Sequence, residues 1–169
     1  LMTVELALPA LLPGLLVALH YGVQLTRPVW GHHSDTQGGR TPFILMGILL
    51  VALGVFGAAW GILLAETSYT WALTLWIVAY GAIGMGIGAA GTSFLALLAS
   101  AASDSRKGAA ATIAWLMLIA GAIIASIGTG FALDPYSPER LLVVIASVCS
   151  IAFLITVIAS LGIERRVDH

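Results

Sequence analysis

The chain has 169 residues, of which 60% are hydrophobic and 9% are charged, and its formal net charge is −1. Soluble domains average about 25% charged residues, so this composition excludes an ordinary soluble domain and indicates an integral membrane protein. The near-neutral charge argues against nucleic acid as a partner, and the single cysteine excludes an intramolecular disulfide framework.

Five apolar segments follow one another along the chain, each long enough to cross about 30 Å of hydrocarbon as a helix. A helix is expected because an exposed backbone finds no hydrogen-bonding partner in lipid. Short links join the segments, so we expect successive helices to be antiparallel neighbours. The chain opens at Leu1 in apolar sequence, and we expect a fragment whose preceding helix is missing. The predicted spans are 10–30, 42–65, 71–98, 109–133 and 139–163.

The first predicted span carries a polar face. His20 is followed by Gln24 one turn later and by Arg27 seven residues on. Polar residues inside a membrane span are functional candidates by default, and a neutral imidazole can bind the magnesium of a porphyrin-type pigment. His20 with Gln24 is therefore the candidate pigment site, and no other metal site is predicted. The alternative is that His20 hydrogen-bonds to a neighbouring helix.

A polar segment, 31–40, separates the first two spans and is predicted to be a loop. Its adjacent histidines, His32 and His33, have no third ligand nearby and are interpreted as solvated. If the spans alternate, six of the seven basic residues fall on the same side of the membrane as this loop. Cytoplasmic loops are enriched in Lys and Arg, so the loop and the C-terminus are predicted to be cytoplasmic.

Glycines recur inside the second and third spans. Gly57 and Gly61, and likewise Gly84 and Gly88, have the four-residue spacing that lets membrane helices approach closely. We predict that both pairs pack against other helices. The sequence contains no arrangement of nucleophile, base and orienting group and no phosphate-binding loop, so it does not indicate an enzyme.

The polar loop resembles the signature loop between the second and third helices of the major facilitator superfamily. The resemblance implies an all-α, major facilitator-type bundle in which the five spans are helices two to six, making residues 1–169 most of an N-terminal transmembrane domain. Such a loop would gate the cytoplasmic face. Thr36 and Gly39 depart from the pattern, which favours arginine at both positions. The gating-motif positions are Arg27, Gly31, Asp35, Gly38 and Arg40.

A closer resemblance is to the PucC/LhaA family of photosynthetic-membrane proteins, over nearly the whole chain but only to the N-terminal half of the family. The phrases that carry it are Arg27-Pro28, Gly31-His32-His33-Ser34-Asp35-Thr36, Arg40-Thr41-Pro42-Phe43-Ile44, Gly91-Thr92-Ser93-Phe94 and Asp134-Pro135-Tyr136-Ser137-Pro138-Glu139-Arg140-Leu141.

This second resemblance implies a role in assembling light-harvesting complexes and in handling or delivering (bacterio)chlorophyll. The implied partners are membrane lipid, light-harvesting or reaction-centre polypeptides and pigment-synthesis enzymes. The implied location is a bacterial inner or photosynthetic membrane. Two alternatives stay open. One is a structural subunit of a photosystem or antenna complex, and the other is a secondary transporter of a small solute, for which the spans contain few polar residues.

Overall fold

The computed structural model of the chain describes residues 9–36 and 39–161, excluding the side chains of residues 33–36. All regular elements in these ranges are helical. Three α-helices (α3, α4 and α6), and α5 together with the turn before it, are long and apolar enough to cross a membrane. The elements are α1 (Leu11–Val23), the 3₁₀ helix η1 (Gln24–Thr26), α2 (Arg27–Thr36), α3 (Thr41–Ala65), α4 (Tyr69–Ala101), the 3₁₀ helix η2 (Asp104–Arg106), α5 (Lys107–Ala132) and α6 (Pro138–Ser160).

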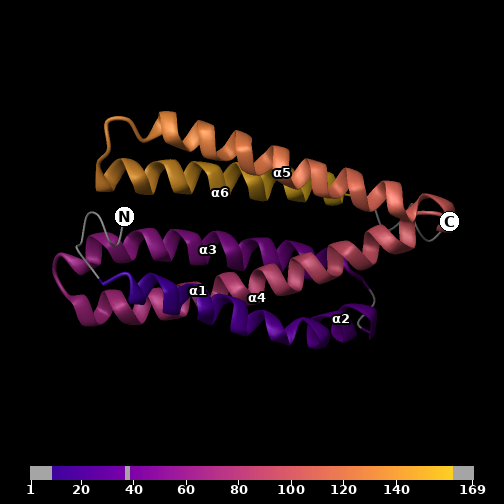
Figure 1. The fold of residues 1–169 in the computed structure, drawn as a ribbon, viewed down its shortest axis with the longest axis horizontal. Helices are drawn as coiled ribbons and strands as arrows, with labels where there is room; N and C mark the ends of the chain where they lie inside the picture. Colours follow the sequence, from indigo (N-terminus) through magenta and orange to yellow (C-terminus); the bar gives the residue numbers. More distant parts are fainter. Residues whose placement is uncertain (1–8, 37–38, 162–169) are drawn as a thin grey trace.

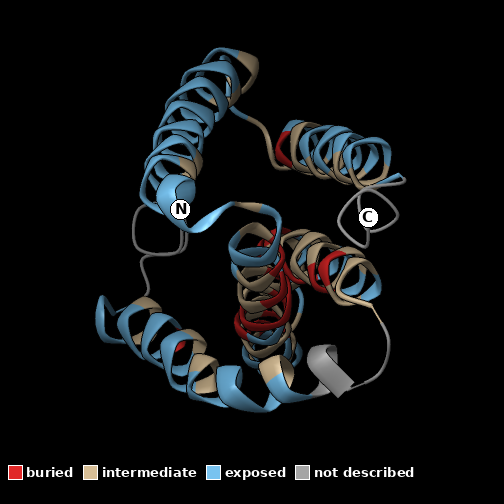
Figure 2. Cartoon of the chain, turned by 90° about the vertical axis from the view of Figure 1, so that its right-hand side faces the viewer, coloured by how far each residue is buried: buried red, intermediate tan, exposed pale blue. Residues whose placement is uncertain are grey.

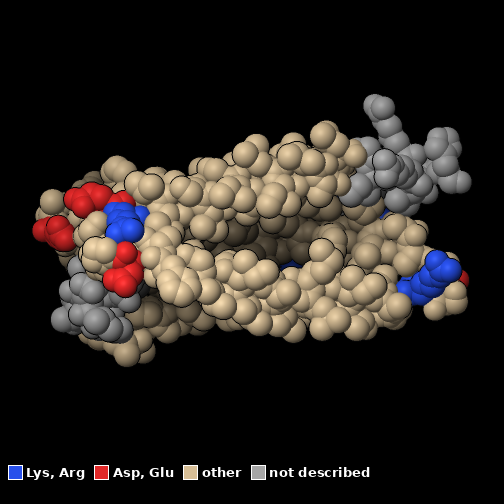
Figure 3. All heavy atoms as spheres, turned by 90° about the horizontal axis from the view of Figure 1, so that it is seen from above, with Lys and Arg blue, Asp and Glu red and all other residues tan. Residues whose placement is uncertain are grey.

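The helices run roughly along one long axis, and α5 and α6 form a layer beside α1, α3 and α4 (Figure 1). Charged side chains gather at the two ends of the molecule, while the face that carries the α5 and α6 layer is apolar between them (Figure 3). An apolar band between two polar ends is the pattern that a bilayer requires. The protein is therefore an all-α membrane protein.

The first predicted span, 10–30, is not one regular helix. It is α1 and α2, joined by the 3₁₀ turn η1. Pro28 lies in the first turn of α2, and a proline lacks the N–H that would bond to the carbonyl four residues earlier, which is that of Gln24. The backbone stays right-handed through the turn, with φ −67° at Gln24 and −49° at Arg27. The segment is thus a bent helix, and the bend follows from the proline.

The polar segment 31–40 was expected to be a loop, and this expectation is wrong for its first part. Helix α2 continues to Thr36, and α3 begins at Thr41. His32 therefore lies on a helix, where it is exposed. Helix formation here costs little, because His, Ser and Thr are each at most about 0.7 kcal/mol less favourable in a helix than alanine.

The closest packing in the bundle is between the antiparallel helices α3 and α4, whose buried residues lie at the centre of the molecule (Figure 2). Three of the α3 glycines that face α4 are seven residues apart, and the residues they meet on α4 are also seven apart. A Cβ atom built on any of these glycines would lie 2.7 Å or less from an atom of α4. A seven-residue repeat on both helices is typical of left-handed packing at a shallow angle. The pairs are Gly47 with Ala90, Gly54 with Ile83, and Gly61 with Trp76.

Trp76 is the largest fully buried side chain among the described residues. Its indole fills the space left by Gly61, and its Nε1 donates to the carbonyl oxygen of Ala58 at 3.1 Å. A buried indole N–H needs such an acceptor, and in lipid no water can supply it. The tryptophan therefore both fills and hydrogen-bonds across the α3–α4 interface.

Helix α5 was expected to be an antiparallel neighbour of α4 and α6, and it contacts both, but it packs loosely against them. None of its residues is buried, and it is exposed along nearly its whole length (Figure 2). Its glycines, Gly121 and Gly128 among them, have no atom of another element within 4 Å of a built Cβ. A short link keeps the ends of two helices close, but it does not require the helices to pack against each other along their length.

We predict that Gly47→Ala destabilises the fold by about 1–3 kcal/mol, the usual cost of overpacking. The added Cβ would lie 2.6 Å from backbone atoms of Gly86 and Ala90, which cannot move without separating the helices. Thermal unfolding in detergent measures the effect. Gly91→Ala is the matched control, because a Cβ there meets nothing within 4 Å. Equal melting temperatures for the two variants would contradict the packing described.

Candidate functional site

The polar face of the first span forms one continuous hydrogen-bonded chain. Gln24 Nε2 lies 2.8 Å from His20 Nε2, and the guanidinium of Arg27 donates to Gln24 Oε1. The three residues lie on α1, η1 and the start of α2, so the hydrogen-bonded chain crosses the 3₁₀ turn. The structure thus brings together the three polar residues that the spacing placed on one helix face.

The chain of donors determines the tautomer of His20. Arginine is only a donor, so Gln24 must present its oxygen to Arg27 and its amide nitrogen to His20. Nε2 of His20 therefore accepts, and the neutral ring carries its proton on Nδ1. That Nδ1 atom is buried and has no hydrogen-bond partner among the described residues. An unsatisfied buried donor costs roughly 1–3 kcal/mol.

This geometry bears on a pigment magnesium, which needs a ring nitrogen with a free lone pair. In the structure Nε2 is engaged by Gln24 and Nδ1 is protonated and buried. The residues therefore do not fit an axial ligand in this arrangement, and Gln24 would have to release Nε2 first. Ligation by His20 stays a prediction. Elsewhere in the described residues no group of three His, Cys, Asp or Glu could hold a metal ion.

Arg40 ties the beginning of α3 to the end of α4. Its Nη1 donates to the carbonyl oxygen of Ala96 at 2.8 Å and to Ser100 Oγ at 2.7 Å, and Ser100 Oγ in turn donates to the carbonyl of Leu97. A cation near a helix C-terminus is also favoured by the helix dipole. Arg40, one of the two arginines of the predicted gating motif, thus holds the end of α4.

The structure describes only some of the other motif positions. Gly31 lies on α2, and a Cβ there would approach Thr92 of α4 to 3.2 Å. Asp35 lies within α2, but its side chain and all of Gly38 are outside the described residues.

The two predicted glycine pairs both lie against neighbouring helices, but only one glycine of each pair is essential. Built Cβ atoms at Gly57 and Gly88 would make ordinary contacts of 3.5 Å or more, whereas at Gly84 the Cβ would lie 2.6 Å from the His20 carbonyl oxygen. Gly61 is equally restricted by Trp76. Sequence reasoning missed the interfacial role of Gly47 and Gly54, which their seven-residue spacing with Gly61 could have indicated.

An apolar cavity of about 400 Å³ lies where α3, α4 and α6 meet. Its walls include Ile44 and Ile48 of α3, Phe94 and Leu97 of α4, and Ile155 of α6. A site of this kind takes hydrocarbon rather than a charged solute. No charged side chain contributes to its lining.

Comparison with known proteins identifies the relatives of this chain. The profile of the PUCC protein family matches residues 1–169. The chain belongs to the PUCC protein family. It is 54% identical, over its whole length, to the bacteriochlorophyll synthase 44.5 kDa chain of Rhodobacter capsulatus, of which it covers 40%. It is 29% identical over 185 residues to Protein PucC of Cereibacter sphaeroides, with 98% of this chain and 39% of that protein covered. No solved structure matches it.

This member of the PUCC family spans about two fifths of the length of those relatives. The resemblance found in the motifs is thereby confirmed at the level of the family. The name of the first relative refers to bacteriochlorophyll synthase, and four helical segments of the present chain are long and apolar enough to cross a membrane.

For this PUCC family protein we predict that Arg40→Gln loosens the end of α4, because it removes two hydrogen bonds from a charged donor, each worth about 1.5–3 kcal/mol. Hydrogen–deuterium exchange should rise at residues 96–101 and not at the Trp76 end of α4. Arg140→Gln is the control, since Arg140 makes its bonds at the opposite end, to the Ala132 and Pro135 carbonyls. Unchanged exchange at residues 96–101 would contradict the anchoring role.

Proposed function

We propose that the chain is part of a membrane protein that assists the assembly of light-harvesting complexes by handling (bacterio)chlorophyll in a bacterial photosynthetic membrane, with its C-terminus in the cytoplasm. Its membership of the PUCC family and the name of its 54% identical relative support this proposal. That name also contains the word synthase, which fits a membrane subunit that works beside a pigment-synthesis enzyme. The described residues offer hydrogen-bonding and packing surfaces, and we propose a non-catalytic role.

The observation that best supports assembly is the exposed face of α5. Its small residues recur at spacings of three, four and seven, so they share one side of the helix. Small residues allow a second helix to approach closely, and within the described chain no helix does so. We infer that a transmembrane helix of an antenna or reaction-centre polypeptide packs there. The small-residue face of α5 comprises Gly121, Ala125 and Gly128, all of which are exposed.

The glycine faces of α3 and α4 are poorer candidates for partner binding. Gly47, Gly61 and Gly84 are already covered by helices of this chain. The apolar cavity among α3, α4 and α6 suits the hydrocarbon part of a pigment. A transporter of a polar solute would need polar groups along its path, and helices α3 and α4 contain no Asp, Glu, Lys or Arg. These features favour assembly and pigment handling over solute transport.

The partner face is tested by replacing its glycines. Gly121→Leu with Gly128→Leu should reduce co-purification of antenna polypeptides at least tenfold, because the leucines hold the partner helix away. Ser126→Leu, on the opposite side of α5, is the matched control and should leave co-purification unchanged. The measurement is the yield of antenna polypeptide with the tagged protein from photosynthetic membranes. If the two sets of variants behave alike, partner binding at this face is excluded.

The pigment site is tested by two variants with opposite expected effects. His20→Leu removes the candidate ligand and should abolish the tetrapyrrole absorption of the purified protein. Gln24→Leu frees His20 Nε2 from a hydrogen bond worth about 1 kcal/mol, and should raise pigment affinity about fivefold. Titration of the apoprotein with pigment, followed by absorption, measures both. If neither variant alters the spectrum, His20 serves only the hydrogen-bonded bend.

A further inference from the structure

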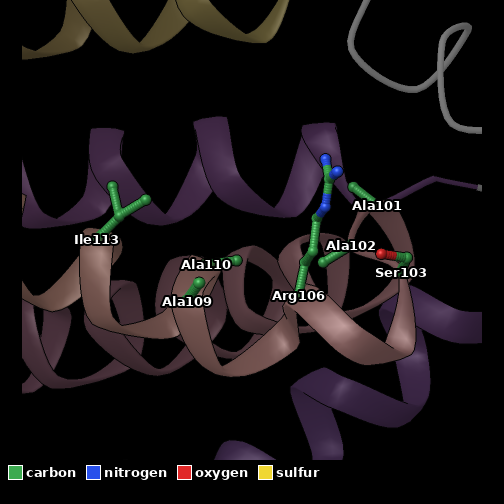
Figure 4. Close-up of a pocket in the computed structure, with 7 residues that line it drawn as sticks. All are labelled: Ala101, Ala102, Ser103, Arg106, Ala109, Ala110 and Ile113. Carbon is green, nitrogen blue, oxygen red and sulfur yellow. The ribbon is translucent and has the colours of Figure 1, made fainter.

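The turn between α4 and α5 lines an open cavity of about 480 Å³ at the same end of the molecule as Arg40. Alanines form most of its lining, and one arginine, Arg106, is its charged member. The side chain of Arg106 extends beside Ala101 and Ala102, and Ala109, Ala110 and Ile113 follow along α5 (Figure 4). The cavity thus has a cationic part and an apolar part.

Arg106 has a charge that nothing in the described chain neutralises. Its guanidinium makes no hydrogen bond or ion pair with a described residue. The neighbouring Lys107 is different, because its Nζ lies 2.7 Å from Asp104 Oδ1. Among the described residues the nearby acid, Asp104, is therefore already paired, and Arg106 contributes a positive charge at the cavity.

The apolar part lies on the membrane side of the arginine. Ile113 is seven residues beyond Arg106, about 10 Å along a helix, and is 58% exposed within an apolar span. In that span the surrounding solvent is lipid. An occupant must therefore pair an anionic group with Arg106 and continue as hydrocarbon over Ala110 towards Ile113.

We propose that this cavity binds an anionic phospholipid, with its phosphate on Arg106 and the upper part of an acyl chain on Ala109, Ala110 and Ile113. A planar guanidinium matches phosphate oxygens in a bidentate geometry. Basic residues at the cytoplasmic surface attract anionic lipid by about 1 kcal/mol each, which is about a fivefold preference. The bound lipid fills the space between α5 and the end of α4, and so fixes the angle at which the exposed helix leaves the bundle.

The proposal is tested with the chain in phosphatidylcholine nanodiscs that contain spin-labelled phosphatidylglycerol, where the motionally restricted fraction of the label reports binding. Arg106→Gln should lower the preference for phosphatidylglycerol about fivefold. Lys107→Gln lowers the net charge by the same amount as Arg106→Gln but keeps Arg106, and should retain the preference. Equal losses in both variants would show general surface charge and overturn the site.

The cavity itself is tested without a change of charge. Ala110→Leu fills the apolar part and should remove the preference, whereas Ala111→Leu, which is exposed and outside the lining, should not. Inorganic phosphate should displace the labelled lipid only weakly. Displacement by phosphate as effective as that by phosphatidylglycerol would show an anion site alone and would overturn the lipid assignment. The absence of any lipid preference in the unaltered chain would overturn it as well. None of these measurements involves pigment or antenna polypeptide.

Discussion

The contact between α3 and α4 is the constraint on which the rest of the structure depends. In a bilayer, burial of apolar surface between helices gains little, because lipid is as apolar as the side chains, and van der Waals contact has to replace it. Close contact requires that the backbones approach, and Gly47, Gly54 and Gly61 allow this at intervals of two helical turns. The other end of the interface is completed by Trp76, whose size compensates for the absent side chain at Gly61.

Helix α4 packs against α3 on one face, and the other faces of α4 determine where the remaining elements lie. Gly84 admits the backbone of α1 at His20, and Arg40 holds the last turns of α4. Helix α1, the turn η1 and helix α2 all contact α4, so the segment stays beside α4 on both sides of the turn. Helix α4 is 33 residues long, about 50 Å, so it extends well beyond the hydrocarbon. The α4–α5 turn and its cavity therefore lie at the membrane surface, where charged lipid head groups are found.

Composition and hydrophobic length were enough to predict a helical membrane protein and the approximate positions of its helices, because lipid leaves the backbone few alternatives. The motifs were enough to predict the family. The bend at Pro28 and the helical state of residues 31–36 were not predicted, since a polar segment beside the membrane can be either helix or loop. The loose packing of α5 could not be predicted either, because an apolar helix has the same sequence pattern whether lipid or protein covers it.

The candidate site shows why polarity within a membrane helix is an incomplete guide to function. His20, Gln24 and Arg27 attract attention because charged and hydrogen-bonding groups are costly in lipid. The structure shows that they hydrogen-bond to one another along the segment. Among their buried side-chain atoms, the one without a partner in the described residues is Nδ1 of His20. A partner or lipid is therefore expected to bind where the chain leaves a surface uncovered or a charge unpaired. The small-residue face of α5 and the cavity at Arg106 meet this criterion, whereas the glycine-rich interface of α3 and α4 does not.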